Sequence, residues 1–217
     1  MPPLEADASS EVRRIAISGG TAELRERGSR FLAVAEPADS ETSARAVRDG
    51  KRAAHHDATH HVWAFRGADG TERWDDDGEP AGTGGRPILA AIESAGLSDV
   101  VIVVTRWFGG TKLGTGGLAR AYGRAAAQAL EAVRQVTVRQ GQILRIRYEW
   151  PDTGAIAAAV QAAGGLRLEE RFDPGPELDV AIPSTLTGAL LAALRDATGG
   201  RAVCTVRQQS LWLRDQP

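Results

Sequence analysis

The tetrapeptide Gly-Thr-Gly-Gly occurs twice in the chain, and each copy stands where a polar loop meets a stretch of helical pattern. Gly82–Gly85 precedes a predicted helix over Arg86–Ala95, and Gly114–Gly117 precedes a predicted helix over Leu118–Val133. Glycine lets backbone N–H groups turn toward one point, and the first turn of a helix adds unpaired donors and the positive end of its dipole. The repeat therefore predicts two loop-to-helix junctions of the same kind, each suited to hold an anion.

A plain tight turn is the alternative interpretation of each junction. Thr83 or Thr115 would then cap its helix, and the glycines would serve only the geometry of the chain. The cations near the loops favour an anion, and they are Arg86, Arg106, Lys112 and Arg120. Both interpretations stay open, because neither loop has the spacing of a Walker motif or of a dinucleotide-binding fingerprint.

Hydrophobic patterns predict a mixed α+β domain around the two loops. Strands are predicted over Thr21–Arg27, Arg30–Ala35, His60–Phe65 and Val100–Thr105. The first two flank a turn at Gly28-Ser29, and the last is a continuous β-branched run that is typical of a buried strand. Asp39 or Ser40 is suited to cap a helix that runs to about Ala54. Residues 67–85 are rich in Gly, Asp and Glu and are predicted to form a long loop.

The rest of the chain predicts a second domain with the order β-α-β-β-α-β, which is the ferredoxin-like pattern. Its predicted strands are Gln142–Glu149, Leu166–Phe172, Leu178–Ile182 and Ala202–Leu211. Asp152 is expected to cap the first helix, and Ser184 or Thr185 the second. A short extended segment, Val136–Arg139, leads into this unit, so the predicted domains are residues 1–138 and 139–217.

Composition excludes several classes of protein. The formal net charge of −2 excludes a generally basic nucleic-acid-binding surface, so any such contact requires a local patch. Cys204 is the single cysteine, which excludes an intrachain disulfide, and its apolar surroundings indicate a buried thiol. No apolar stretch reaches the ~20 residues of a membrane span, and the N-terminus lacks a secretory pattern. We expect a cytoplasmic protein without membrane contact.

Acidic side chains and histidines in the first half supply the candidate catalytic residues. Asp77 and Glu79 lie in an acidic loop, where they are placed to orient a neighbouring arginine. All four histidines stand close together, but His60 and His61 face opposite sides of a predicted strand, so neither a metal nor another cofactor is predicted. His60 is a candidate general base beside the two carboxylates.

Several motifs in this order resemble the IMPACT/YigZ family. They are Ala58–His60, Asp76–Pro87, Arg106–Gly110, Leu113–Leu118 and Ala121–Gly123. The resemblance is strong over about residues 20–133, and the two-domain layout is similar to that of the bacterial branch. Trp107-Phe108 stands where bacterial relatives often have two tyrosines, and Lys112 stands at a commonly apolar position.

The resemblance implies a particular fold and a link to translation. It implies an N-terminal domain like the second domain of ribosomal protein S-five, with a left-handed βαβ crossover, contrary to the usual hand. It also implies a ferredoxin-like C-terminal domain similar to domain V of elongation factor G. Eukaryotic members regulate translation by restraining an initiation-factor kinase, and bacterial members are suspected of binding nucleic acid or the ribosome.

Two functions remain open at this point. The first is a translation-associated regulator that binds RNA or a ribosomal component, because aromatic side chains beside cations suit single-stranded bases and phosphates. The second is an enzyme acting on a small phosphorylated or carboxylated molecule in the same cleft, with His60, Asp77 and Glu79 as candidate catalytic residues. The expected binding residues are Gly82, Thr83, Gly84, Gly85, Arg86, Arg106, Trp107, Lys112, Thr115, Gly116, Gly117 and Arg120.

Overall fold

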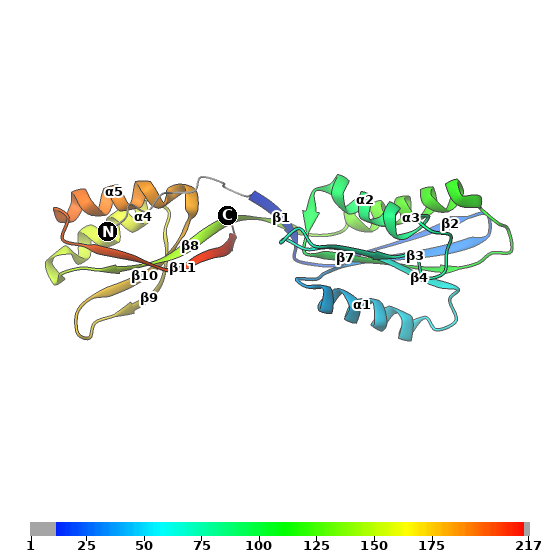
Figure 1. Cartoon of the computed structure of the whole chain (residues 1–217), viewed down its shortest axis with the longest axis horizontal. Helices are drawn as coiled ribbons and strands as arrows, with labels where there is room; N and C mark the ends of the chain where they lie inside the picture. Colours follow the sequence, from blue (N-terminus) through cyan, green and yellow to red (C-terminus); the bar gives the residue numbers. More distant parts are fainter. Residues whose placement is uncertain (1–11, 215–217) are drawn as a thin grey trace. The chain divides into compact units, whose positions relative to one another are not determined.

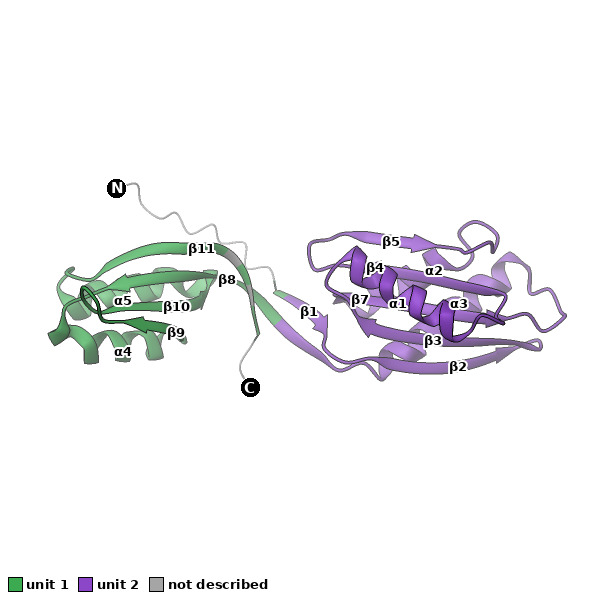
Figure 2. Cartoon of the chain, turned by 90° about the horizontal axis from the view of Figure 1, so that it is seen from below, with its two compact units in different colours: residues 1–12, 138–217 green, residues 13–137 purple. Residues whose placement is uncertain are grey.

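The computed structural model describes residues 12–214, in which the chain forms two compact units (Figures 1 and 2). One unit comprises residues 13–137, and the other comprises Val12 and residues 138–214 of the described part. Strand β8 (Gln135–Arg147) begins in the first unit and continues into the second. No helix within residues 12–214 is long and apolar enough to cross a membrane.

A five-stranded antiparallel sheet forms the middle of the unit 13–137, in the order β2-β3-β7-β4-β5. Its strands are β2 (Gly20–Glu26), β3 (Ser29–Pro37), β4 (His60–Arg66), β5 (Glu72–Asp75) and β7 (Val100–Trp107). The short strands β1 (Val12–Ala16) and β6 (Leu97–Ser98) pair in parallel. The four strands predicted for this domain are confirmed.

Strand β5 corrects the prediction that residues 67–85 form only a loop. The strand has four residues, most of them exposed, and Trp74 is its single large apolar side chain. Such a segment has no alternating pattern that a sequence could reveal. Its pairing with β4 gives the first Gly-rich loop a fixed starting point on the sheet.

Helices cover both faces of this sheet (Figure 1). Helix α1 (Glu41–Ala54) packs on one face over Trp63 and Phe65, whereas α2 (Gly85–Ala95) and α3 (Gly114–Glu131) cover the opposite face. Both faces of β7 are therefore buried, which explains its continuous β-branched run. Helix α1 begins as predicted, because its N-cap serine forms a reciprocal capping box with the serine three residues later.

The turn between β2 and β3 lies one residue earlier than predicted. Its central residues are Arg27 and Gly28, not Gly28 and Ser29, and their φ angles are 47° and 82°. Two positive φ angles are characteristic of a type I′ turn, whose twist matches the twist of the flanking strands. Ser29 instead begins β3 and is fully buried.

The unit 138–214 has the predicted order β-α-β-β-α-β. After β8 its elements are α4 (Thr153–Ala162), β9 (Leu166–Arg171), β10 (Glu177–Pro183), α5 (Thr187–Thr198) and β11 (Val203–Arg214). Neighbouring strands in the order β11-β8-β10-β9 are all antiparallel. Helices α4 and α5 cover one face of these strands, over a core that includes Leu144, Ile146 and Val180 (Figure 1).

The entry into this unit differs from the prediction. The extended segments predicted at Val136–Arg139 and Gln142–Glu149 belong largely to the single strand β8. Gly141, which resembles a strand breaker in the sequence, lies inside β8 where Leu213 and the Ile182 carbonyl leave no room for a Cβ. The glycine therefore permits close packing instead of ending the strand.

The predicted helix caps of this unit are also corrected. Asp152 precedes α4, but its carboxylate accepts hydrogen bonds from Arg201 at 2.6 and 3.2 Å and caps nothing. Ser184 and Thr185 form a short 3₁₀ turn, so α5 begins at Thr187 without a side-chain cap. At Asp152 the contact with Arg201 replaces the capping bond.

Candidate functional site

The first Gly-Thr-Gly-Gly loop closes around a carboxylate of the chain itself. Asp76 Oδ1 accepts hydrogen bonds from the N–H groups of Gly84 and Gly85, both at 2.9 Å, and Oδ2 accepts one from Gly82 at 2.7 Å. Burial alone would raise the pKa of Asp76, but the three N–H donors outweigh burial and hold that pKa below its ordinary value. The donors that the sequence offers to an external anion are thus occupied by Asp76.

Thr83 does not cap α2 in this loop. Its hydroxyl donates to the Pro80 carbonyl at 2.6 Å, and the N-cap position is taken by Gly84, which has no side chain. A Cβ on Gly84 would come within 2.6 Å of Val62 Cγ1, so the glycine lets the loop lie against the sheet. The capping prediction for Thr83 is therefore wrong.

A buried cluster of charged and polar side chains joins the first loop to β7 and α3. Arg106 Nη1 donates to Glu79 Oε1 at 2.5 Å, and the Tyr122 hydroxyl donates to the same oxygen at 2.7 Å. Arg106 Nη2 also donates to Ser29 Oγ at 3.2 Å. Arg106 and Glu79 are only 4% and 8% exposed, and burial raises the pKa of the Tyr122 hydroxyl above its ordinary value. A buried ion pair is tolerated when further hydrogen bonds support it, as Tyr122 and Ser29 do here. These bonds tie the first loop, through Glu79, to the sheet and to α3.

The other candidate catalytic residues, His60 and Asp77, lie at the edge of this cluster. His60 Nε2 is 3.8 Å from Glu79 Oε1, and His60 Nδ1 is hydrogen-bonded to the Asp77 carbonyl at 2.8 Å. The Asp77 carboxylate accepts the His61 N–H at 2.6 Å and forms an ion pair with Arg52. The structure thus brings His60, Asp77 and Glu79 together, with both carboxylates bonded within the chain.

The histidines form no ligand set for a metal. His61 is buried, and burial lowers the pKa of its imidazole. Within residues 12–214, no group of three or more His, Cys, Asp or Glu side chains is arranged to hold a metal ion. What the arrangement offers chemically is one half-buried imidazole, His60, near a carboxylate.

The second Gly-Thr-Gly-Gly segment does not precede its helix but forms the first turn of it. Helix α3 begins at Gly114, whose φ is 71°, and Leu113 stands at the N-cap without a side-chain hydrogen bond. Thr115 therefore lies inside the helix and caps nothing. Each interior glycine disfavours a helix by about 1 kcal/mol, and the packing of α3 on the sheet overrides that penalty. The predicted helix start after Gly117 is wrong for this reason.

Three of the four predicted cations are exposed, and they are Arg86, Lys112 and Arg120. None of the three forms an ion pair with a residue in the part of the chain that the structure describes. The Arg86 guanidinium lies over the exposed Trp74 ring, 4.3 Å from its centroid. Arg106 is the fourth cation and belongs to the buried cluster, so it is not part of the exposed basic surface.

The two aromatic residues after Arg106 differ in accessibility. The face of Trp107 is covered by the Arg30 guanidinium at 4.5 Å, and its indole N–H donates to Asp57 at 2.9 Å. This hydrogen bond lowers the pKa of Asp57. Phe108 is 47% exposed. The aromatic surface available beside the second loop is therefore Phe108, which the set of expected binding residues omitted.

The comparisons with known proteins cover the residues that form these contacts. Residues 27–130 match the Impact N-terminal domain, a range that includes the Asp76 loop and the Arg106 cluster. A Thermus thermophilus protein described as an IMPACT family member in the pol 5′ region is 43% identical over 177 residues, which are 80% of this chain and 95% of that protein. The chain belongs to the IMPACT family.

Two further comparisons extend this similarity over both units. The IMPACT family member YigZ of Escherichia coli strain K12 is 34% identical over 179 residues, covering 79% of this chain and 86% of that protein. A solved crystal structure of a hypothetical protein has a TM-score of 0.64 at 29% identity, covering 92% of this chain and 98% of that one. The overall α+β architecture of this IMPACT family protein is thus shared with an experimentally determined structure.

Asp76 and Tyr122 are residues of the candidate site in this IMPACT family protein that sequence reasoning missed. Both stand inside the motifs that carry the family resemblance, yet no role was expected for either. Asp76 has a local signal, since an aspartate shortly before a glycine-rich segment is suited to accept its N–H groups. Tyr122 has none, because its contact with Glu79 spans 43 residues of sequence.

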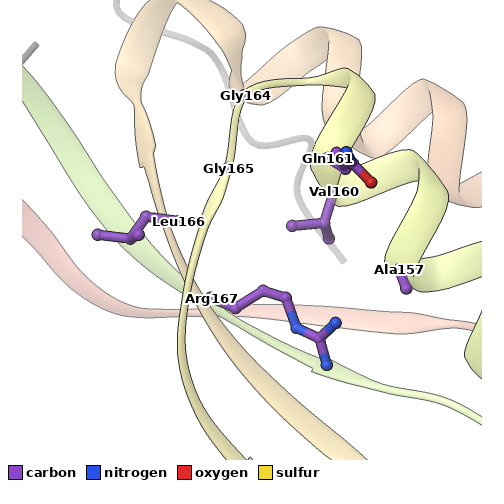
Figure 3. Close-up of a pocket in the computed structure, with 7 residues that line it drawn as sticks. All are labelled: Ala157, Val160, Gln161, Gly164, Gly165, Leu166 and Arg167. Carbon is purple, nitrogen blue, oxygen red and sulfur yellow. The ribbon is translucent and has the colours of Figure 1, made fainter. Parts of the chain in front are cut away.

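A separate pocket of about 460 Å³ in the unit 138–214 contains none of these residues (Figure 3). Its lining is Ala157, Val160, Gln161, Gly164, Gly165, Leu166 and Arg167. Arg167 is the charged member, and it is paired with Glu170. The lining supplies no acid, base or nucleophile, so we place no chemistry in this pocket of the IMPACT family protein.

Proposed function

We propose that this protein is a translation-associated regulator that binds RNA, free or within a ribosomal component, through the N-terminal ends of α2 and α3 and the loop before α3. The observation that carries the proposal is the set of exposed cations without a described carboxylate partner: Arg86, Lys112 and Arg120. Trp74 beneath Arg86 and the exposed Phe108 add aromatic surface. Cations interleaved with aromatic rings are what single-stranded bases and phosphates require.

The two Gly-Thr-Gly-Gly segments contribute to this surface in different ways. The first is held by Asp76, so it positions Arg86 at the beginning of α2 and offers few donors of its own. The second forms the first turn of α3, where no side chain caps the backbone N–H groups. Those groups are suited to receive a phosphate together with Arg120.

An enzyme acting on a small phosphorylated or carboxylated substrate is the second candidate. It is favoured by the approach of His60 Nε2 to Glu79 Oε1 at 3.8 Å. However, Glu79 already accepts hydrogen bonds from Arg106 and Tyr122, which leaves its carboxylate committed to the fold. RNA binding therefore has the stronger support.

We also propose fold assignments and a location that the family resemblance suggests. The domains are residues 1–138 and 139–217, and the compartment is the cytoplasm. The first domain is like the second domain of ribosomal protein S-five, and β5-α2-β7, whose strands both lie antiparallel to β4, is its left-handed crossover. The second is ferredoxin-like and similar to domain V of elongation factor G, which the strand order β11-β8-β10-β9 supports.

RNA binding across a salt series tests the proposed function. A labelled single-stranded RNA is titrated with the wild-type protein and with an Arg86→Ala/Arg120→Ala variant, and the affinity is measured at several salt concentrations. We expect the logarithm of the wild-type affinity to fall linearly with the logarithm of the salt concentration. The variant should bind at least about tenfold more weakly at low salt, with a shallower salt dependence.

The matched control is Arg45→Ala/Arg48→Ala, which removes the same charge from α1 on the opposite face of the sheet. It should bind RNA like the wild type. Absent binding by the wild type, or equal losses in both variants, contradicts the proposal. Absent binding would also favour the enzyme, which is then tested with small phosphorylated molecules.

A further inference from the structure

A small pocket in the unit 13–137 lies between the β2–β3 turn and the beginning of α3. We call it the hairpin pocket, and its charged lining residues are Glu26, Arg27, Arg120 and Arg124. Its volume is about 210 Å³. Pockets for drug-sized molecules usually measure about 300–1,000 Å³, so the hairpin pocket suits one small chemical group and not a whole metabolite.

The charge of the hairpin pocket is positive and poorly compensated. Three guanidinium groups face one carboxylate, and Glu26 approaches Arg124 only to 3.9 Å. Arg27 and Arg120 form no ion pair with any residue that the structure describes. Two guanidinium groups without a described carboxylate partner, beside a third that is weakly paired, are suited to a group that carries more than one negative charge.

All three arginines stand at positions that are unfavourable for the stability of the fold. Arg27 occupies the turn with a φ of 47°, where Asn or Gly is preferred in a type I′ turn. Arg120 and Arg124 are four residues apart on α3, so like charges lie on the same helix face and repel each other. Both arrangements cost stability, and both place a guanidinium at the same pocket. Residues whose backbone conformation or neighbouring charges are unfavourable for stability are often found at functional positions.

We propose that the hairpin pocket binds one phosphoryl group of an RNA, held by the guanidinium groups of Arg27, Arg120 and Arg124. The planar guanidinium matches phosphate oxygens with two parallel hydrogen bonds, which favours a phosphoryl group over a simple halide. Gly117 of α3 also lines the pocket and adds no side chain to it. This inference rests on the proposed function, because the phosphoryl group is that of the bound RNA, either internal or at its 5′ end.

The test compares the wild type with an Arg27→Ala/Arg124→Ala variant, neither residue of which belongs to the surface proposed above. Both proteins are titrated with a single-stranded RNA that carries either a 5′-phosphate or a 5′-hydroxyl, and separately with pyrophosphate alone by calorimetry. We expect the variant to bind RNA at least tenfold more weakly. Its salt slope should be shallower by about 0.7, which corresponds to one phosphate contact on a single strand. Pyrophosphate should bind the wild type and not the variant.

The RNA end distinguishes the source of the phosphoryl group. If the variant's loss appears only with the 5′-phosphorylated RNA, the pocket holds the terminal phosphate, and equal losses with both RNAs indicate an internal one. Arg25→Ala/Arg134→Ala is the matched control for loss of two charges and should bind both ligands like the wild type. Thermal melting checks that the variants are folded.

The failure of this inference differs from the failure of the proposed function. Wild-type RNA affinity in the Arg27→Ala/Arg124→Ala variant, together with unchanged pyrophosphate binding, overturns the pocket and leaves the proposed function standing. Pyrophosphate binding that depends on these arginines, without any RNA binding by the wild type, supports the phosphoryl site and overturns the proposed function. If the wild type binds neither RNA nor pyrophosphate, the hairpin pocket and the proposed function are both overturned.

Discussion

Asp76 takes the place of a bound anion in the first Gly-Thr-Gly-Gly loop. Its carboxylate accepts three backbone hydrogen bonds, two of them from the buried Gly84 and Gly85. A glycine-rich junction at a helix start can hold an anion, and the chain here supplies one of its own. At the scale of single residues, the motif is therefore a positioning device for the beginning of α2.

Replacing Asp76 should destabilise the protein through this loop. Asp76→Ala leaves two buried N–H groups without a partner, and we expect a loss of about 2–3 kcal/mol in the free energy of unfolding. Asp76→Asn retains one oxygen for Gly84 and Gly85 and should lose only about 1 kcal/mol. Urea unfolding of the three proteins measures both values. Equal stability of Asp76→Ala and the wild type would show that the loop does not depend on the carboxylate.

The same carboxylate predicts a dependence of stability on pH. The pKa of Asp76 is lower in the folded protein than its ordinary value, so its stabilisation is complete above an unfolded pKa of about 3.9 and is lost as the pH falls through the folded pKa. The stability difference between the wild type and Asp76→Asn should therefore shrink below about pH 4. Unfolding curves at neutral and acidic pH test this, and a constant difference would contradict it.

The ion pair of Arg106 and Glu79 predicts strong coupling between two residues. Arg106→Ala leaves a buried carboxylate without its partner and should cost about 3–5 kcal/mol. Once Glu79→Gln has removed the negative charge, the further change Arg106→Ala should cost much less. A double-mutant cycle of unfolding free energies measures the coupling. Additive losses would indicate that Arg106 is not held by Glu79.

At the scale of elements, the site is built by loops that meet across the end of the sheet. The loop after β7 crosses the β2–β3 turn so closely that a Cβ on Gly109 would clash with the Gly28 backbone and Ser29 N. Ser29 Oγ accepts the Gly109 N–H at 3.2 Å and the Arg106 Nη2–H at the same distance. The β2–β3 turn, β7 and the buried cluster are thus one packed structure.

Gly109→Ala should weaken this crossing. The added methyl group forces the two loops apart, and we expect a loss of about 1–3 kcal/mol in the free energy of unfolding. The control is Gly50→Ala in the exposed interior of α1, where no atom lies within 4 Å of the added methyl group. That change should stabilise the protein by about 0.5–1 kcal/mol. Stability of Gly109→Ala equal to the wild type would contradict the close approach.

The elements of this fold follow from local pattern more readily than the site does. Alternation and β-branching identify β3, β4 and β7, and a serine cap identifies the beginning of α1, because these signals lie within a few residues. The Arg106 cluster was not predictable in full, since Tyr122 reaches Glu79 from a distant helix. The α3 start was also missed, because glycine opposes a helix locally and only tertiary packing reverses that preference.

At the scale of the whole molecule, several arginines on the strands of the unit 138–214 are paired with carboxylates, whereas three exposed cations near the beginnings of α2 and α3 have no such partner among the described residues. On the strands of the unit 138–214, Arg145 bonds Asp179 through two hydrogen bonds of 2.8 Å, Arg147 pairs with Glu177, and Arg171 pairs with Asp179. Charges that neutralise one another attract a phosphate backbone weakly. The exposed, unpaired cations at the beginnings of α2 and α3 are the reason why we propose the unit 13–137 as the RNA-binding one.

This difference predicts where charge matters for binding. Arg147→Ala should leave RNA affinity within about twofold of the wild type, because the removed guanidinium is already neutralised by Glu177. Arg120→Ala removes the same charge from α3 and should weaken binding several-fold. Titration with one single-stranded RNA at low salt compares the two variants directly. Equal losses would mean that overall charge, and not the α2–α3 surface, governs binding.

The central claim is that RNA contacts the N-terminal ends of α2 and α3 and the loop before α3. The most direct measurement is nuclear magnetic resonance mapping, in which backbone amide shifts of the full chain are followed as single-stranded RNA is added. We predict that the largest shifts fall on residues 85–90 and 112–120, with those of the strands in the unit 138–214 unchanged. Shifts confined to the unit 138–214, or no shifts at any RNA concentration, would contradict the claim.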